Sequence, residues 1–192
     1  MSRILKCLLG LFAALVLSAC AQKIDFKGTA IEDSSMGGDF KLTDFHGKPR
    51  GLDELRGKVV ALFFGYTSCP DVCPTTLLEY ASVMKQLGVD SDKVQVLFVS
   101  VDPERDTPQV LAGYVPHFDK RFIGLTGGSA DIEKVMKQYK VVAQKVRNEE
   151  GGYTVDHSAG SYLLDKEGKL RVYEAYGTPA ANLASDIRQL LR

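Results

Sequence analysis

The 192-residue chain lacks an excess of charge of either sign, because 24 Lys and Arg stand against 24 Asp and Glu. It has no basic stretch that could follow a phosphate backbone, so we expect no nucleic-acid partner. It also lacks internal repeats and low-complexity segments, while 45% of its residues are hydrophobic. This length and composition predict one globular domain with a single core.

The N-terminus lacks an apolar run long enough to span a bilayer, which takes about 20 residues. The run from Cys7 to Leu17 is shorter, and it follows Arg3 and Lys6. A basic start, a short apolar run and small residues after it are typical of a secretory signal. We therefore predict that the protein is exported.

The end of that run, Leu17-Ser18-Ala19-Cys20, resembles the bacterial lipobox, in which the Cys becomes the lipidated first residue of the mature protein. We predict a lipoprotein signal peptide at residues 1–19. A lipid on Cys20 would anchor the protein to the cell membrane on its outer (periplasmic or extracytoplasmic) side. The alternative is an ordinary signal peptide in which Cys20 is incidental.

Cysteine is scarce, and processing makes it scarcer. Of the four cysteines, Cys7 would leave with the signal peptide and Cys20 would be acylated. Only Cys69 and Cys73 would remain as thiols, in a compartment where disulfides persist. A bridge between them would close too small a loop to stabilise the fold much. We therefore interpret this pair as chemical rather than structural.

Hydrophobic patterning predicts an α/β domain. Residues 20–38 are polar and rich in Ser and Gly at their end, which favours a lipid-anchored tether before a domain at 39–192. Apolar runs at 59–64 and 94–101 are typical of buried strands, and helical spacing fills 74–87 between them. A strand, a helix and a strand in this order predict a parallel pair.

Shorter elements complete the predicted fold. An edge strand is expected at 39–44, a hairpin at 161–173 and a last helix from Thr178 to Leu191. This order is that of a thioredoxin-like fold. Two additions are predicted: an extra N-terminal β-hairpin and an inserted β-hairpin near residue 150, where His157 would lie in the loop before the strand at 161–164.

The segment Cys69-Pro70-Asp71-Val72-Cys73-Pro74 lies where the first buried strand passes into its helix. Ligands of open α/β sheets bind at this edge. Two cysteines four apart on one helical face can share a metal ion or form a disulfide, and the helix N-terminus favours a thiolate. The alternative is a pair of buried structural cysteines. A thioredoxin C-x-x-C motif is excluded by the spacing.

A metal site would need a further ligand, and the chain has three histidines. His46 and His117 are most simply surface residues, whereas the loop that holds His157 is expected beside the cysteine turn. Two thiolates and one imidazole suit Cu(I), since Zn²⁺ would require a fourth ligand. Asp102, at the end of the second buried strand, is expected either to tune this site from outside or to pair with Arg105.

Three separated motifs together resemble the Sco/SenC family. They are Phe64-Gly65-Tyr66-Thr67-Ser68-Cys69-Pro70-Asp71-Val72-Cys73-Pro74-Thr75-Thr76-Leu77, Val101-Asp102-Pro103-Glu104-Arg105-Asp106-Thr107-Pro108 and Asp156-His157-Ser158. The resemblance implies a thioredoxin-like fold and one copper ion, Cu(I) or Cu(II), bound by Cys69, Cys73 and His157. It also implies a role in assembling the dinuclear copper site of cytochrome c oxidase. The implied partners are the oxidase copper-site subunit or another copper chaperone. Ser68 replaces a common His of the family and Asp39 a common Pro, and neither is a proposed ligand.

Two functions remain open from the sequence. One is a copper metallochaperone, which is not an enzyme. The other is a thiol–disulfide reductase that keeps the oxidase cysteines reduced, with Cys69 and Cys73 as its redox pair. His157 favours the metal, because disulfide exchange does not require an imidazole. A peroxidase would need a single activated Cys, so the C-x-x-x-C pair disfavours it.

The lipid anchor is tested by Cys20→Ser. We expect this change to block lipid attachment and processing by the lipoprotein route, because the thiol is the acylated group. Mass spectrometry of the membrane fraction measures both. Unmodified wild-type protein that starts at another residue and still stays on the membrane would contradict the prediction.

Overall fold

The computed structural model describes residues 25–31, 35–149 and 151–192. The predicted signal peptide and the lipid on Cys20 lie outside these residues. Within them, no helix has the length and apolar character needed to cross a membrane.

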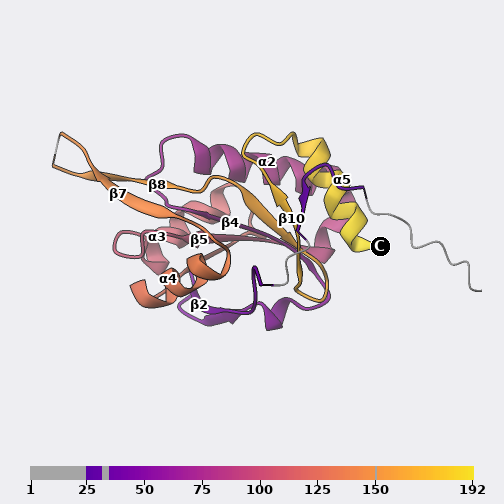
Figure 1. Ribbon diagram of the computed structural model, residues 1–192, viewed down its shortest axis with the longest axis horizontal. Coiled ribbons are helices and arrows are strands. Elements are labelled where there is room, and N and C mark those ends of the chain that lie inside the picture. Colours follow the sequence, from indigo (N-terminus) through magenta and orange to yellow (C-terminus); the bar gives the residue numbers. More distant parts are fainter. Residues whose placement is uncertain (1–24, 32–34, 150) are drawn as a thin grey trace, which may run out of the picture.

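An eight-stranded mixed sheet forms the centre of the domain, in the order β1-β10-β9-β4-β5-β6-β2-β3 (Figure 1). The strands are β1 (Thr29–Ala30), β2 (Lys41–Asp44), β3 (Pro49–Gly51), β4 (Val59–Gly65), β5 (Val94–Ser100), β6 (Ile123–Thr126), β9 (Ser161–Leu164) and β10 (Leu170–Glu174). Strands β4, β5 and β6 run parallel, and β9 is antiparallel to β4. The predicted thioredoxin-like arrangement is confirmed.

Helices cover both faces of the sheet, which explains why β4 and β5 are continuous apolar runs. The helices are α2 (Val72–Leu87), α3 (Pro108–Tyr114), α4 (Ser129–Gln138) and α5 (Ala180–Leu191), with short 3₁₀ helices at Asp53–Leu55, Gly88–Lys93 and Val115–His117. In β4, Ala61 and Phe63 pack in the core formed with α2, α3 and α5. Leu62 and Phe64 face the opposite core, formed with α4. The alternation of a strand thus divides one sequence run between two layers.

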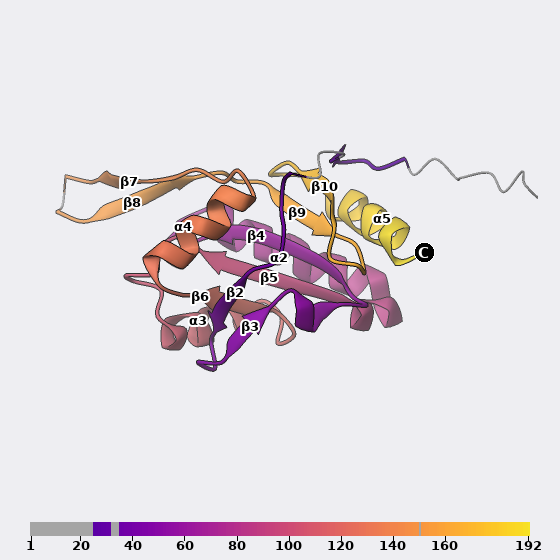
Figure 2. The same ribbon diagram turned by 60° about the horizontal axis from the view of Figure 1, so that its bottom comes forward.

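Two hairpins extend this minimum. Strands β2 and β3 pair antiparallel, but β2 also pairs with β6, so it is not the edge strand that the alternation predicts. Strands β7 (Ala143–Arg147) and β8 (Tyr153–His157) form a separate two-stranded sheet. This hairpin projects well beyond the rest of the domain (Figures 1 and 2). His157 is the last residue of β8, rather than part of a loop as expected.

The tether predicted at 20–38 is partly packed on the domain. Strand β1 pairs with β10, and the N–H groups of Lys27 and Gly28 donate to the Asp186 carboxylate at 2.8–2.9 Å. Asp186 is fully buried on α5. A short polar segment gives no local sign of such a distant acceptor, so the sequence pattern did not predict these contacts.

Gly65 allows helix α2 to approach the end of β4. A Cβ atom at this position would lie 2.5 Å from Sγ of Cys73 and 2.9 Å from the Phe98 ring. Both distances are shorter than van der Waals contact. The absence of a side chain at Gly65 therefore sets how close Cys73 comes to the sheet.

We expect Gly65→Ala to destabilise the metal-free protein by about 1–3 kcal/mol, because the added methyl group overpacks a filled core. Gly113→Ala is the matched control. Gly113 lies in α3, and a Cβ there meets nothing within 4 Å. That change should stabilise the protein by about 0.5–1 kcal/mol through helix propensity. Urea unfolding measures both, and equal effects of the two changes would contradict the packing argument.

Candidate metal centre

The two cysteines converge from a turn and a helix. Cys69 lies half-buried in the turn after β4, and its N–H donates to the Tyr66 carbonyl at 3.2 Å. Helix α2 begins at Val72, so Cys73 is in its first turn and fully buried. Cys69 precedes the helix, and the expectation that both cysteines occupy one helical turn is wrong. Both thiols are free.

Asp106 fixes the cysteine turn to the neighbouring strand. Its carboxylate accepts hydrogen bonds from the Thr67 N–H at 3.0 Å, the Thr67 hydroxyl at 2.6 Å and the Ser100 hydroxyl at 2.6 Å. Asp106 is fully buried. A buried carboxylate needs such donors, and here they hold the turn rigidly beside the end of β5.

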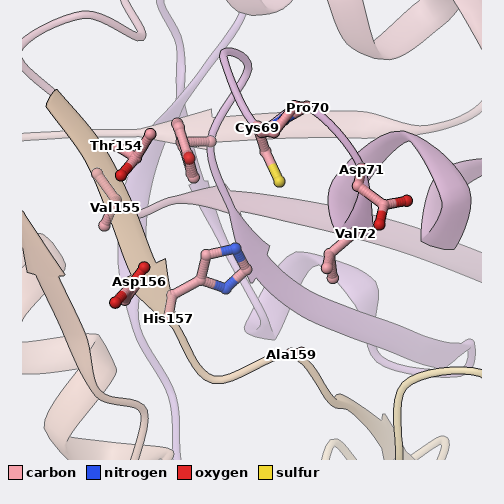
Figure 3. Close-up of a pocket in the computed structure, with 10 residues that line it drawn as sticks. Cys69, Pro70, Asp71, Val72, Thr154, Val155, Asp156, His157 and Ala159 are labelled. Carbon is pink, nitrogen blue, oxygen red and sulfur yellow. The ribbon is translucent and has the colours of Figure 1, made fainter. Parts of the chain in front are cut away.

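His157 supplies a nitrogen beside these sulfurs. Its Nδ1 lies 2.9 Å from the Ser158 carbonyl oxygen, and its Nε2 lies 3.5 Å from Sγ of Cys73. A neutral imidazole that donates from Nδ1 carries its lone pair on Nε2, which is the form that binds a metal. The ring of His157 and the sulfur of Cys69 point toward each other across the site (Figure 3).

The ligand atoms of Cys69, Cys73 and His157 all lie within 4.8 Å of one another. Metal bonds to sulfur and nitrogen are about 2.0–2.3 Å long, so two ligand atoms on one ion lie at most about 4.6 Å apart. A closure of a few tenths of an ångström would therefore let all three bind one ion. His46 and His117 are exposed and do not belong to this group.

The group opens onto a cleft of about 400 Å³. The cysteine turn and the start of α2 form one wall, with Pro70 and Val72. Strand β8 and the segment after it form the other wall, with Thr154 and Ala159. Cys69 and His157 are both partly exposed here. A metal held by these residues would be reachable from solvent.

Tyr66 is buried and also lines the cleft. Its ring meets the His157 ring edge-on, with centroids 5.9 Å apart and an interplanar angle of 87°. Burial raises the pKa of the Tyr66 phenol above its ordinary value. The ring restricts the imidazole, and neither the motif nor the spacing in the sequence indicates this role.

Burial sets the charge of the inner cysteine. It raises the pKa of the Cys73 thiol far above its ordinary value, the nearby Cys69 raises it further, and a hydrogen bond from the Tyr66 backbone opposes both. In the metal-free protein Cys73 is therefore a neutral thiol. The expected stabilisation of a thiolate by the helix N-terminus is too weak at this position, because desolvation outweighs it. A bound cation would replace the proton.

Asp102 lies outside the group of three ligands. It is fully buried, pairs with Nε of Arg105 and accepts a hydrogen bond from the Tyr153 hydroxyl at 2.9 Å. The sequence predicted that Asp102 would either tune the site from outside or pair with Arg105, and the structure shows the ion pair with Arg105. The contact with Tyr153 was not predicted, because 51 residues separate the two in the chain.

Residues 28–192 match the SCO1/SenC family. The chain belongs to this family. It is 37% identical over 162 residues to the SCO2-like protein of Rickettsia prowazekii. This match covers 83% of this chain and 79% of that protein.

Solved structures of the SCO1/SenC family have the same fold. ScoI of Bradyrhizobium japonicum with copper bound is 44% identical, with a TM-score of 0.76 over 81% of this chain and 99% of that chain. BsSco, described as having a disulfide switch and as a member of the Sco family of cytochrome c oxidase assembly proteins, is 25% identical. Its TM-score is 0.66, over 85% of this chain and 98% of that chain.

The raised pKa of Cys73 predicts its reactivity. In the metal-free Cys69→Ser variant, we expect the alkylation rate of Cys73 to be still rising about tenfold per pH unit at pH 9. The reason is that the folded thiol stays protonated above its usual pH range. The urea-unfolded variant should level off near pH 9. Peptide mass spectrometry measures both rates, and levelling off below pH 8 in the folded protein would contradict the burial argument.

Proposed function

We propose that this protein binds one copper ion through Cys69, Cys73 and His157 and carries it to the dinuclear copper site of cytochrome c oxidase. The observation that carries the proposal is the group of two sulfurs and one imidazole nitrogen within 4.8 Å at the mouth of an open cleft. Membership of the SCO1/SenC family and the copper-bound relative support it.

The donor set favours copper over zinc. Thiolates are soft ligands that suit Cu(I), and three ligands satisfy this ion. Structural zinc sites have four ligands, whereas the group in the described part of the chain has three. Cu(II) is also compatible with the imidazole.

The exposure of the site favours a carrier over a permanent metal centre. Cys69 and His157 are partly exposed along the cleft, while Cys73 is buried beneath them. Ligands of an acceptor could approach the ion from the open side and replace the outer two ligands first. The acceptor proposed here is the oxidase copper-site subunit or another copper chaperone.

The proposal includes a lipid on Cys20 and a location outside the cytosol. Its support is the lipobox-like segment at residues 17–20. The described segment contacts the domain from Asp25 onward, where the Gln189 side chain donates to the Asp25 carbonyl at 2.9 Å, so few residues separate the proposed lipid from the domain. The carrier would thus be held close to the membrane that contains its acceptor.

A thiol–disulfide reductase is the second candidate. Its support is that both thiols are free, that their sulfurs lie within 4.8 Å and that Cys69 is partly exposed. The disulfide switch of BsSco is consistent with such redox chemistry in a relative. Exchange between a dithiol and a disulfide gives His157 no role, and this favours the carrier.

Copper binding is tested with ligand variants of the reduced protein. The wild type should bind one copper ion and gain about 4 kcal/mol of stability when free copper is a thousandfold above its dissociation constant. Ala at Cys69 or Cys73 should abolish this gain, and His157→Ala should weaken it. His117→Ala is the matched control, because it removes an exposed imidazole outside the site. Wild-type binding by His157→Ala would exclude it as the third ligand.

His157→Ala also separates the carrier from the reductase. The variant should exchange disulfides at near wild-type rate in vitro, because both thiols remain. In cells that lack the protein, it should fail to restore oxidase activity at limiting copper. Full rescue by His157→Ala, together with loss of rescue in both Cys variants at equal protein level, would favour the reductase instead.

A further inference from the structure

His157, the third proposed ligand, lies on strand β8, which is not part of the main sheet. Strand β8 pairs with β7 alone, in a register from Ala143 and His157 to Arg147 and Tyr153. The cysteines, in contrast, follow β4, which is paired on both sides. Besides the short link from His157 to β9, side-chain contacts therefore determine where the hairpin holds His157 relative to the two sulfurs.

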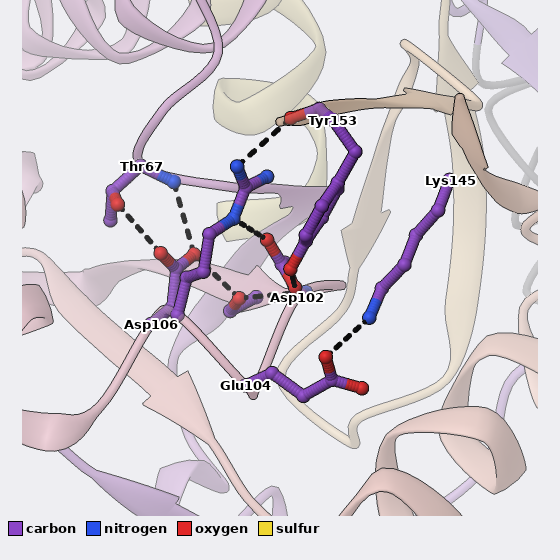
Figure 4. A network of polar contacts seen from close by, with 8 residues as sticks. Thr67, Asp102, Glu104, Asp106, Lys145 and Tyr153 are labelled. Atoms are coloured by element: carbon purple, nitrogen blue, oxygen red, sulfur yellow. Dashed lines mark hydrogen bonds and ion pairs between the residues drawn. The ribbon is translucent and has the colours of Figure 1, made fainter. Parts of the chain in front are cut away.

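Arg105 makes the principal contacts with the far end of β8. Its Nη1 donates to the Tyr153 carbonyl at 2.9 Å, and its guanidinium carbon lies 3.8 Å from the centroid of the Tyr153 ring. Asp102 pairs with Nε of Arg105 and accepts the Tyr153 hydroxyl hydrogen bond at 2.9 Å (Figure 4). One arginine and one buried carboxylate thus hold both the backbone and the side chain of Tyr153.

Arg105 also reaches the His157 ring through Tyr66. The guanidinium carbon lies 5.6 Å from the centroid of the Tyr66 ring, which meets His157 edge-on. Tyr66 and Val155, in the middle of β8, belong to the same buried core cluster. Contacts at 153, 155 and 157 therefore follow one side of the strand and end at the proposed ligand.

We infer that Arg105 is a positioning residue of the copper site, which holds the β7–β8 hairpin so that His157 meets Cys69 and Cys73. The inference rests on the proposed copper-binding function. Asp106, the next residue, fixes the cysteine turn through Thr67. A single loop between β5 and α3 thus sets the separation between the two halves of the site.

The chemistry of arginine suits this position. Its planar guanidinium stacks on Tyr153 while its nitrogens donate to Asp102 and to a backbone carbonyl, which a lysine ammonium cannot do in the same geometry. Outer partners of metal ligands typically change metal affinity by about 10–100-fold. We expect Arg105→Met to weaken copper binding by about this factor and Arg105→Lys to recover only part of it.

The experiment uses full-length protein purified from membranes in detergent. Cu(I) affinity is measured by competition with a colorimetric chelator for wild type, Arg105→Met and Arg105→Lys, each also combined with His157→Ala. Arg121→Met is the matched control, because Arg121 does not belong to the site. Its Nη2 pairs with the Asp119 carboxylate at 2.6 Å. Arg105→Met should weaken binding about 10–100-fold when His157 is present and less than about twofold when it is absent. The control should change affinity less than about twofold in both backgrounds.

Two further measurements distinguish positioning from general destabilisation. In Cu(II)-loaded protein, the nitrogen coupling of His157 in the electron paramagnetic resonance spectrum should weaken in Arg105→Met. In metal-free protein, amide hydrogen exchange should accelerate in β8 and stay unchanged in α2. If Arg105→Met does not fold, Tyr153→Phe makes the same test, since it removes only the hydroxyl bonded to Asp102.

Unchanged affinity in Arg105→Met, or an equal loss with and without His157, would overturn the inference. Unchanged exchange in β8 would also overturn it. Failure of the wild type to bind copper would instead overturn the proposed function. The exchange measurement on metal-free protein then still decides whether Arg105 holds the hairpin.

Discussion

Strands β4 and β5 end side by side, and the site depends on this parallel register. Gly65 pairs with Ser100 at the end of the ladder, and the Val101 N–H donates to the Gly65 carbonyl at 2.8 Å. Because parallel strands deliver their following segments to the same sheet edge, the cysteine turn and the loop that contains Asp106 emerge together. Asp106 can then fasten one to the other. The sheet thereby supports the chemistry of a turn that has little structure of its own.

Burial and exposure are divided among the three proposed ligands. Cys73 is enclosed between Gly65 and the core, where desolvation keeps its thiol neutral until a cation replaces the proton. Cys69 and His157 lie at the cleft, where an acceptor could reach the ion. A fully enclosed site would hold copper but hinder its transfer, and a fully exposed one would bind less selectively. The mixture suits a carrier.

The inserted β7–β8 hairpin, which contributes His157 to the proposed site, is a sheet separate from the main one. It has no strand pairing with the main sheet, so its position depends on other contacts, among them those of Arg105, Asp102 and Tyr66 and the packing of buried Val155 in the core. The cysteine half is rigid by comparison, since it is fixed by β4, α2 and Asp106. In the proposed copper site, one loop thus contacts both the cysteine turn, through Asp106, and the hairpin, through Arg105.

Periodicity and spacing by themselves determined the βαβ unit, the order of a thioredoxin-like domain, and the pair Cys69 and Cys73 at a strand-to-helix turn. The expected place of His157, in the segment before the strand at 161–164 and beside the cysteine turn, made it a candidate ligand. The tertiary structure decided the rest: that Cys69 precedes α2, that burial governs Cys73, that Asp186 binds the backbone of Lys27, and that Arg105 holds Tyr153. Local patterns report hydrophobic faces and turns, because these depend on near neighbours. Pairs separated by 48 or 159 residues depend on how the layers pack, and no local pattern encodes them.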